Sequence, residues 1–280
     1  MKTKSGMLLT TQEEQVKRWE EHFSEIFNKD DNSIGSKQEM RNIEDNNENE
    51  NETEVSLDPP TKTEIQLALS QLKNRKAAGL DNIYPEVLKD DPEITAEMLY
   101  HLLEKIWEEE KIPGDWEEGL IIKIRKKVDL SNCNNWSGVA LLSIPSKILT
   151  RIQKTNSVEQ HLRKEQAGFR KHRSCVYLRK ILEQSIEWQA VLCVTFIDFE
   201  KAFDCVKREM IWLALQERGI TREIIEIIKI LYNGFKCKFS HEGKLSDFIE
   251  VRNVVRQGCS LTPTLFLLIL DRVMKRAEGL

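Results

Sequence analysis

The sequence lacks the features that mark disulfide-stabilised, secreted and membrane-spanning proteins. None of its six cysteines stands in a CxxC pair, and no apolar signal segment precedes them. We interpret them as reduced thiols of an intracellular protein, nuclear or cytoplasmic and not secreted, rather than as disulfides or zinc ligands. The apolar run 261–270 is interrupted by Pro263. It is also shorter than the roughly 20 residues that span a bilayer, so we expect no membrane anchor.

A strong net charge is missing too. The chain has 42 basic and 46 acidic residues and a net charge of −4, so the total charge does not indicate a nucleic-acid-binding protein. The distribution of charge is more informative. Acidic residues concentrate before Asp58, whereas the stretches 123–127 and 163–179 are locally basic. The later part of the chain is therefore more cationic than the average suggests.

The first 56 residues divide into two segments. Residues 1–28 form a helical leader, because Val16, Trp19 and Phe23 recur at helical spacing between positions 10 and 28. Residues 29–56 are dominated by Asn, Glu, Asp and Ser. A segment so poor in large apolar side chains cannot offset its ordering entropy, which predicts an acidic disordered linker.

From residue 57 onward, helical and strand patterns mix without a regular alternation, which predicts an α+β fold. Thr61 and Glu64 have capping-box spacing, and we expect the helix they begin to close at Gly79. The run 191–197 is apolar and rich in β-formers, which predicts a strand buried on both faces. Further helices are predicted at 96–110, 145–152, 178–186, 207–216, 221–232 and 261–274, and further strands at 119–124, 234–241 and 247–254, with a basic hairpin or loop at 126–136.

Asp198 ends the apolar run 191–197, and two interpretations of it stand side by side. A carboxylate at the end of a buried strand pays a desolvation penalty unless it is solvated, paired or bound to a metal, and Mg²⁺ prefers oxygen ligands on rigid elements. Asp198 could equally cap the helix that follows. The pair Gln257-Gly258 is also ambiguous. A glycine before a helix allows close approach to a phosphate, but the same residues suit an ordinary turn.

Several motifs taken in order are more specific than any one of them. The series resembles the reverse transcriptase of non-LTR (LINE-type) retrotransposons over about residues 57–275. The motifs are Lys76-Ala-Ala-Gly-Leu-Asp81, Lys126-Lys-Val-Asp129, Asn135-Trp-Ser-Gly-Val-Ala-Leu-Leu142, Gln166-Ala-Gly-Phe-Arg170, Phe196-Ile-Asp-Phe-Glu-Lys-Ala-Phe-Asp204 and Arg256-Gln-Gly-Cys-Ser-Leu-Thr-Pro263.

This resemblance implies a right-hand polymerase fold. Residues 57–190 would form the fingers and residues 191–280 the N-terminal part of a truncated palm, with the thumb absent. Asp198 would bind two catalytic Mg²⁺ ions, assisted by the backbone carbonyl of Phe199. In two-metal catalysis one ion activates the primer 3′-OH and the other neutralises the leaving pyrophosphate.

The resemblance also implies the substrates and the residues that bind them. Phe203 matches the steric gate that excludes a ribonucleotide, and Gln257 and Gly258 match the element that packs near the incoming nucleotide. Lys126 and Lys127 lie in the motif that contacts the triphosphate. The expected partners are an RNA template, a DNA primer and deoxynucleoside triphosphates, and no protein partner is predicted.

Two departures from the family pattern point to an RNA-directed DNA polymerase fragment that is inactive in this chain. Ser137 stands where the family has an arginine, and serine cannot replace a bidentate cation. The second metal-binding motif, two adjacent aspartates expected after Lys275, is absent. The expected loss of that palm hairpin would expose the apolar face of the strand before Asp198, which predicts poor solubility.

Two other functions remain open. One is a non-catalytic nucleic-acid-binding module derived from a reverse transcriptase. The other is a gene product without a selected function. The cations that motivate the binding module are Lys123, Arg125, Lys126, Lys127, Arg170, Lys171 and Arg173.

Overall fold

A computed structural model gives the architecture of most of the chain. The residues it describes are 1–28, 58–154, 158–163, 166–170, 176–199, 202–203, 206–252, 256 and 258–278. The predicted linker at 29–56, together with Lys171, Arg173 and Gln257, lies outside them.

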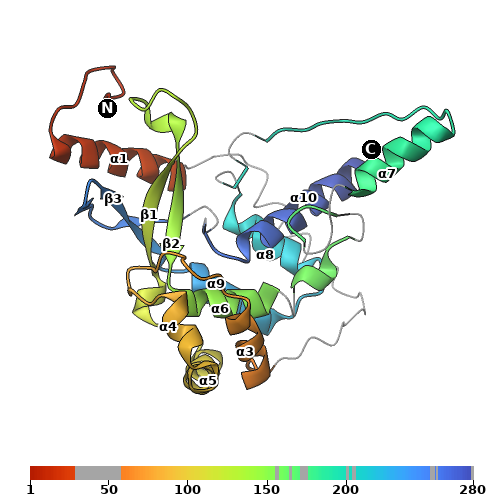
Figure 1. The fold of residues 1–280 in the computed structure, drawn as a ribbon, viewed down its shortest axis with the longest axis horizontal. Helices are drawn as coiled ribbons and strands as arrows, with labels where there is room; N and C mark the ends of the chain where they lie inside the picture. The colour runs from red at the N-terminus through yellow and green to blue at the C-terminus, as the bar shows by residue number, and fades with distance from the viewer. Residues whose placement is uncertain are drawn as a thin grey trace.

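One mixed sheet lies at the centre of the molecule (Figure 1). The strands β1 (Glu118–Arg125) and β2 (Trp136–Leu142) are antiparallel, and β3 (Lys236–His241) runs parallel to β1. The short strands β4 (Lys244–Leu245) and β5 (Ile249–Glu250) both pair with β3. The sheet therefore joins the predicted fingers and palm regions, whose division stays a prediction. The combination of this sheet with many helices confirms the α+β fold class.

Strand β2 was not predicted from the sequence. Ser137 and Gly138 weaken its strand pattern, because glycine leaves a strand without a side chain to pack. Pairing with β1 compensates for this weakness, in a register that runs from Gly119 opposite Leu142 to Arg125 opposite Trp136. The loop that joins the two strands is the polar, basic hairpin loop that was predicted.

Helix α1 (Gln12–Phe27) packs against the sheet and confirms the predicted leader helix. Thr11 and Glu14 form a capping box at its start. Trp19 and Phe23 are buried, and each ring lies 5.5 Å from the ring of Phe239 in β3. The apolar face that the periodicity indicated is thus the face that meets the sheet.

The helices α3 (Lys62–Ser70), α4 (Pro85–Asp90), α5 (Pro92–Glu109) and α6 (Ile144–Gln153) lie together at one end of the sheet (Figure 1). The capping box of Thr61 and Glu64 is confirmed at the start of α3.

The predicted role of Gly79 as the end of that helix is wrong, since α3 ends at Ser70. Gly79 instead packs against the end of β2. A Cβ on it would lie 2.8 Å from the carbonyl carbon of Leu142 and from the nitrogen of Ser143. Close approach of two backbones, rather than a helix cap, requires glycine here.

The helices α8 (Arg208–Gln216), α9 (Arg222–Tyr232) and α10 (Thr262–Glu278) agree with the predicted helices to within a few residues. Helix α9 carries much of the core, because Ile225, Ile228 and Leu231 are all buried. None of the described helices is long and apolar enough to cross a membrane. The four cysteines within the described ranges are free thiols, as expected: Cys133, Cys193, Cys237 and Cys259.

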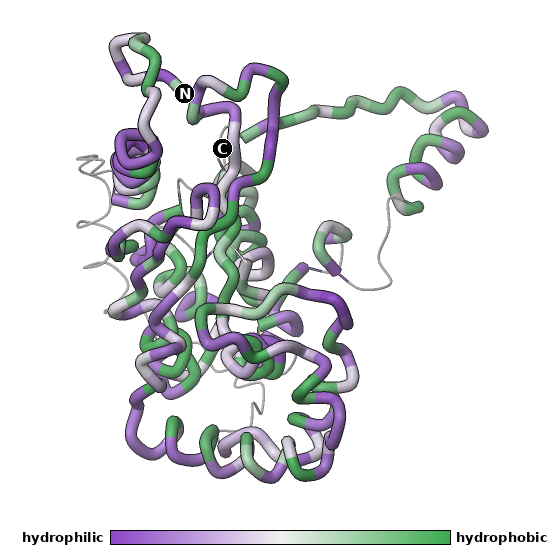
Figure 2. Tube along the Cα trace, turned by 60° about the vertical axis from the view of Figure 1, so that its left-hand side comes forward, coloured by the Kyte–Doolittle hydropathy of each residue, from purple (hydrophilic) through white to green (hydrophobic). Residues whose placement is uncertain are grey.

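Helix α7 (Val176–Glu187) and the segment that follows it project from the rest of the molecule (Figure 1). We call residues 176–199 the projecting arm. The predicted buried strand at 191–197 is wrong, because this stretch is extended but joins no sheet strand in the described part of the chain. Val191 is 94% exposed and Phe196 is 86% exposed, and the segment is largely hydrophobic in Figure 2. A strand needs neighbours for its backbone hydrogen bonds, and apolar composition does not supply them.

Candidate functional site

Asp198 lies near the end of the projecting arm and is exposed to solvent. Within the described residues no hydrogen bond or ion pair holds its carboxylate. The adjacent Phe199 is about half exposed, and its ring meets the ring of Phe266 in α10 edge to face, with centroids 6.4 Å apart. Asp198 is therefore attached to the core through its aromatic neighbour and not through a sheet.

Three segments that are distant in sequence are linked by a chain of ring contacts that ends at Phe266. The ring of Phe203 lies 4.9 Å from that of Phe266, and the ring of Phe169 lies 6.3 Å from that of Phe203. Aromatic pairs at such distances add stability beyond the area that they bury. The motif around Arg170, the motif around Asp198 and helix α10 thus share one cluster of rings. We call Phe169, Phe199, Phe203 and Phe266 the aromatic cluster.

Gly258 places a second motif against the sheet. Its φ of +106° favours glycine, and a Cβ at this position would collide with the carbonyl oxygen of Ala140 in β2. Ser260 makes a 2.9 Å hydroxyl hydrogen bond with Thr150 of α6. The first contact brings the start of α10 against the Asn135–Leu142 motif, and the second ties it to α6.

Arg256, two residues before Gly258, is buried, and sequence reasoning gave it no role. Its guanidinium donates hydrogen bonds to the carbonyl oxygens of Leu231 and, at 2.7 Å, of Trp116. It also lies 4.1 Å from the centre of the Phe235 ring. Burial lowers the pKa of Arg256 from its ordinary value. A lone arginine beside a turn carries no sequence signal for burial, so only the fold identifies this contact.

Lys147 of α6 is a second residue that sequence reasoning missed. Its amino group interacts electrostatically with Asp81 and Cys259. Burial lowers the pKa of Lys147, and those two neighbours oppose the shift. One lysine thus interacts electrostatically with a residue of the motif that contains Gly79 and with a residue of the motif that contains Gly258.

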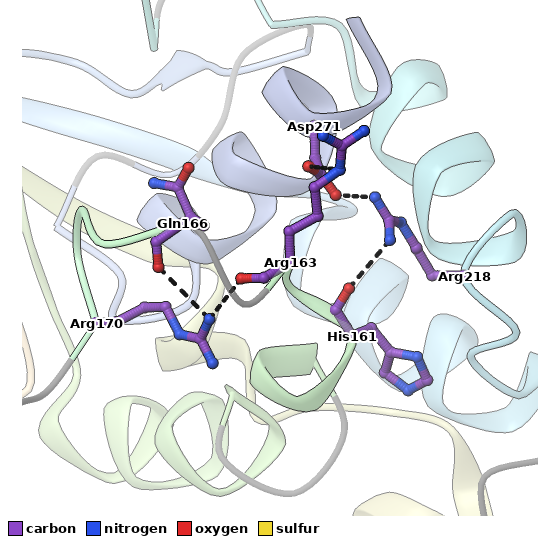
Figure 3. A network of polar contacts seen from close by, with 6 residues as sticks. All are labelled: His161, Arg163, Gln166, Arg170, Arg218 and Asp271. Carbon is purple, nitrogen blue, oxygen red and sulfur yellow. Dashed lines mark hydrogen bonds and ion pairs between the residues drawn. The ribbon is translucent and has the colours of Figure 1, made fainter. Parts of the chain in front are cut away.

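A network of ion pairs connects the Arg170 motif to α10 (Figure 3). Asp271 of α10 pairs with Arg163 at 2.9 Å and with Arg218. The guanidinium of Arg218 also donates to the carbonyl oxygen of His161, and that of Arg170 donates to the carbonyl oxygen of Arg163 at 2.7 Å. Two cations around one buried carboxylate fix this loop, because leaving either partner alone would bury an uncompensated charge. The side chain of Arg170 thus stabilises the loop to which it belongs.

Lys126 and Lys127 lie exposed at the tip of the β1–β2 hairpin. Their backbone N–H groups both donate to the carbonyl oxygen of Asn135, at 2.8 and 3.3 Å, which closes the loop. Ser137 stands opposite Ile124 in the same hairpin. In the described part of the chain, no hydrogen bond or ion pair joins either lysine to Asp198.

Lys123 is not an available phosphate contact, which corrects its place among the predicted binding cations. Its amino group lies 5.0 Å from the ring of Trp19, 5.3 Å from that of Trp136 and 5.1 Å from that of Phe239. Its nitrogen is 2.6 Å from Nδ1 of His241. The quadrupoles of three rings stabilise the cation, so Lys123 holds α1 on the sheet.

The contact with Lys123 fixes the protonation of His241. A lysine ammonium has only donors, so Nδ1 of His241 must accept and the imidazole must be neutral. Its Nε2–H then donates to the side-chain oxygen of Gln15 in α1 at 2.8 Å. Burial, and then the charge of Lys123, lower the pKa of His241.

The described residues supply an incomplete set of ligands for Mg²⁺. Asp198 offers one carboxylate and Phe199 one backbone carbonyl. No group of three or more His, Cys, Asp or Glu side chains is placed to hold a metal ion in the described ranges. The assignment of Mg²⁺ to Asp198 therefore stays a prediction.

Comparison with known proteins connects these segments to one family. Residues 124–279 match the family model described as reverse transcriptase (RNA-dependent DNA polymerase). A Xenopus laevis protein named "Transposon TX1 uncharacterized 149 kDa protein" is 23% identical over 79% of this chain and 18% of its own length. A Popillia japonica protein, "Retrovirus-related Pol polyprotein from type-1 retrotransposable element R2", is 27% identical over 77% of this chain and 30% of its own length.

A third relative, "RNA-directed DNA polymerase from mobile element jockey" of Drosophila funebris, is 25% identical over 75% of this chain and 24% of its own length. The chain thus spans less than a third of the length of each of these curated relatives.

Proposed function

The chain belongs to the reverse transcriptase (RNA-dependent DNA polymerase) family, with relatives among non-LTR retrotransposon proteins, and from this we propose that it is part of an RNA-directed DNA polymerase. Residues 57–190 contribute the fingers and residues 191–280 the N-terminal part of the palm. The template is RNA, the primer is DNA, and deoxynucleoside triphosphates are the substrates. The free thiols support an intracellular location, nuclear or cytoplasmic.

The observation that carries this proposal is the meeting of family motifs from distant parts of the chain. Gly258 packs against the carbonyl oxygen of Ala140, and Phe203 packs against Phe266. Neither contact follows from local sequence. The first joins two segments that the family resemblance marks independently, and the second joins such a segment to helix α10.

Each proposed role falls on a named residue. Asp198, with the carbonyl of Phe199, contributes ligands for Mg²⁺. Phe203 acts as the steric gate, and its ring is supported by Phe266. Gln257 and Gly258 pack near the incoming nucleotide. The exposed side chains of Lys126 and Lys127 contact its triphosphate.

We also propose that the 280 residues alone do not extend a primer. Asp198 is an exposed carboxylate on an arm outside the sheet, and two-metal displacement needs ions held on both the attacking and the leaving oxygen. In addition, the triphosphate lacks the arginine that the family has at the position of Ser137.

Primer extension on an RNA template with Mg²⁺ tests this proposal. We expect no incorporation by the purified chain. Robust incorporation that Asp198→Ala abolishes would overturn the proposed inactivity and would support the polymerase assignment. Incorporation that survives Asp198→Ala would contradict the role given to Asp198.

A second candidate function is a non-catalytic nucleic-acid-binding module. The exposure of Arg125, Lys126 and Lys127 at one hairpin tip favours it. Binding through phosphates releases counterions, so affinity should fall steeply as salt rises. The double variant Lys126→Gln/Lys127→Gln should flatten that dependence, whereas Lys105→Gln on α5 should not. RNA binding that does not change with salt would exclude this function.

A further inference from the structure

Arg256 is among the largest fully buried side chains of the protein, and it makes no ion pair in the described part of the chain. A buried guanidinium without a carboxylate is costly, so its surroundings must compensate for the lost hydration. Two backbone carbonyls and one aromatic ring surround it, and none of them can take its proton. The cation is therefore held by two charge-assisted hydrogen bonds and one ring, while Glu117 favours it electrostatically without forming an ion pair.

The carbonyls come from different elements. Leu231 lies in the last turn of α9, where unpaired carbonyls give the helix end a negative partial charge. Trp116 ends the short 3₁₀ helix η1 (Gly114–Trp116), and Phe235, whose ring lies beneath the guanidinium, precedes β3. The planar fork of arginine suits two acceptors at fixed angles, and a lysine ammonium does not reproduce it.

The backbone of Arg256 is tied to the turn that contains Gly258. Its carbonyl oxygen accepts from the N–H of Cys259 at 3.1 Å and from the hydroxyl of Thr262 at 2.8 Å. Gly258 lies within this turn, against Ala140 of β2. The side chain of Arg256 is thus fixed in the core while its backbone closes the turn that meets the sheet.

We propose that Arg256 is a positioning residue for the Gly258 turn and thereby for the incoming deoxynucleoside triphosphate. It does not touch the nucleotide, because its guanidinium is directed into the core. It fixes the position of Gly258 against β2. The part of this inference that concerns the nucleotide rests on the proposed function, whereas the part that concerns the turn does not.

Two substitutions of Arg256 distinguish positioning of the turn from a general role in stability. Arg256→Met removes two hydrogen bonds but also removes the desolvation cost of a buried cation, and the second effect offsets part of the first. Arg256→Met could therefore keep the fold and still release the turn. Arg256→Lys keeps the charge but loses the fork, and it gives a second variant if the methionine variant does not fold.

Arg208 offers a matched control close by. It is also largely buried, lies 5.5 Å from the ring of Tyr232, and donates to the carbonyl oxygen of Val251 at 2.6 Å. Arg208→Met removes a comparable guanidinium that does not close the Gly258 turn.

Two measurements on the full chain test the inference. One is hydrogen exchange of the Cys259 amide, and the other is the affinity for fluorescently labelled dGTP in the presence of an RNA template–DNA primer duplex. Because two charge-assisted hydrogen bonds of the guanidinium anchor the residue whose carbonyl closes the turn, both Arg256 variants should speed the exchange and weaken the affinity by roughly tenfold or more. Arg208→Met should change neither.

Several outcomes would overturn the inference. One is a Cys259 amide that stays protected in Arg256→Met, and another is an unchanged affinity despite a loosened turn. Unfolding of both Arg256 variants would show a general stability role instead. If the wild-type chain binds no labelled dGTP, the proposed function fails, and the exchange data alone decide whether Arg256 positions the turn.

Discussion

The sheet core and the projecting arm contain the same kinds of side chain in opposite environments. Trp19 in the core is 1% exposed, whereas Trp188 in the arm is 69% exposed. In the core, the Gly258 turn packs against β2 and α6, and the buried side chain of Arg256 holds it in place. The arm carries Asp198 on an extended segment that is held at its end through Phe199.

This difference indicates which part of the proposed site is held rigidly by contacts with the rest of the fold. The turn is held because its glycine, its arginine and its hydroxyls each have a partner in another element. The arm has β-forming residues without a neighbouring strand, so its composition does not fix its place. The nucleotide-binding half of the proposed site is thus preorganised by the fold, and the metal-binding half is not.

The largest difference in stability between the two regions is expected when a tryptophan in each is replaced by alanine. Trp19→Ala should lower the free energy of unfolding by about 3–5 kcal/mol, because it empties the contact between α1 and the sheet. Trp188→Ala should change it by no more than about 0.5 kcal/mol. Urea unfolding followed by circular dichroism measures both values. Equal losses would mean that the arm is packed as tightly as the core.

A smaller effect is expected from glycine to alanine changes in two turns. Gly258→Ala should cost roughly 2–4 kcal/mol, because it adds a strained positive φ to a collision with Ala140. Gly243 has a φ of +83° but nothing within 4 Å of its Cβ position, so Gly243→Ala should cost only about 1 kcal/mol. The same unfolding measurement separates backbone strain from close approach. A Gly258→Ala variant no worse than Gly243→Ala would contradict the close packing on β2.

The pH dependence of stability probes the contact between α1 and the core. The folded protein lowers the pKa of His241 below its ordinary value of 6.5, first through burial and then through Lys123. The unfolded chain therefore binds the proton more readily. The stability that the neutral imidazole contributes is complete above pH 6.5 and is lost as the pH falls through the lowered pKa.

We expect the free energy of unfolding to fall more between pH 7.5 and about 5 in the wild-type chain than in His241→Gln. His101→Gln is the control, because His101 is exposed on α5. A fall of the same size in wild type and in His241→Gln would show that His241 does not control this dependence.

The sequence predicted the elements whose determinants are local. Helical periodicity located α1 and α9, and the spacing of Thr61 and Glu64 located the start of α3, because each signal lies within a few residues of the structure that it specifies. The sequence also suggested close approach at Gly258, but to a ligand, whereas the structure shows it packed against Ala140 of β2.

Features that depend on distant partners were missed or predicted wrongly. Strand β2 forms because β1 pairs with it, and Gly79 packs on the end of β2 rather than closing a helix. Arg256 is buried because three other segments surround it. The opposite error occurred before Asp198, where the composition predicted a buried strand and no described neighbour pairs with it.

The smallest expected effect on stability comes from the apolar face of the arm. Phe196→Ser should change the free energy of unfolding by no more than about 0.5 kcal/mol, since its ring is already exposed. It should nevertheless improve solubility, because an unpaired extended apolar segment is a template for association. Size-exclusion chromatography should show aggregates of the wild-type chain and a larger monomer fraction for the variant.

Ile94→Ser provides the control for that measurement, because Ile94 is 60% exposed but lies on helix α5 instead of on an extended segment. If apolar exposure alone caused association, both variants should increase the monomer fraction. If unpaired backbone beside apolar side chains is required, only Phe196→Ser should do so. A clean monomer peak for the wild-type chain would contradict the expected association, and the arm would then differ from the core only in exposure.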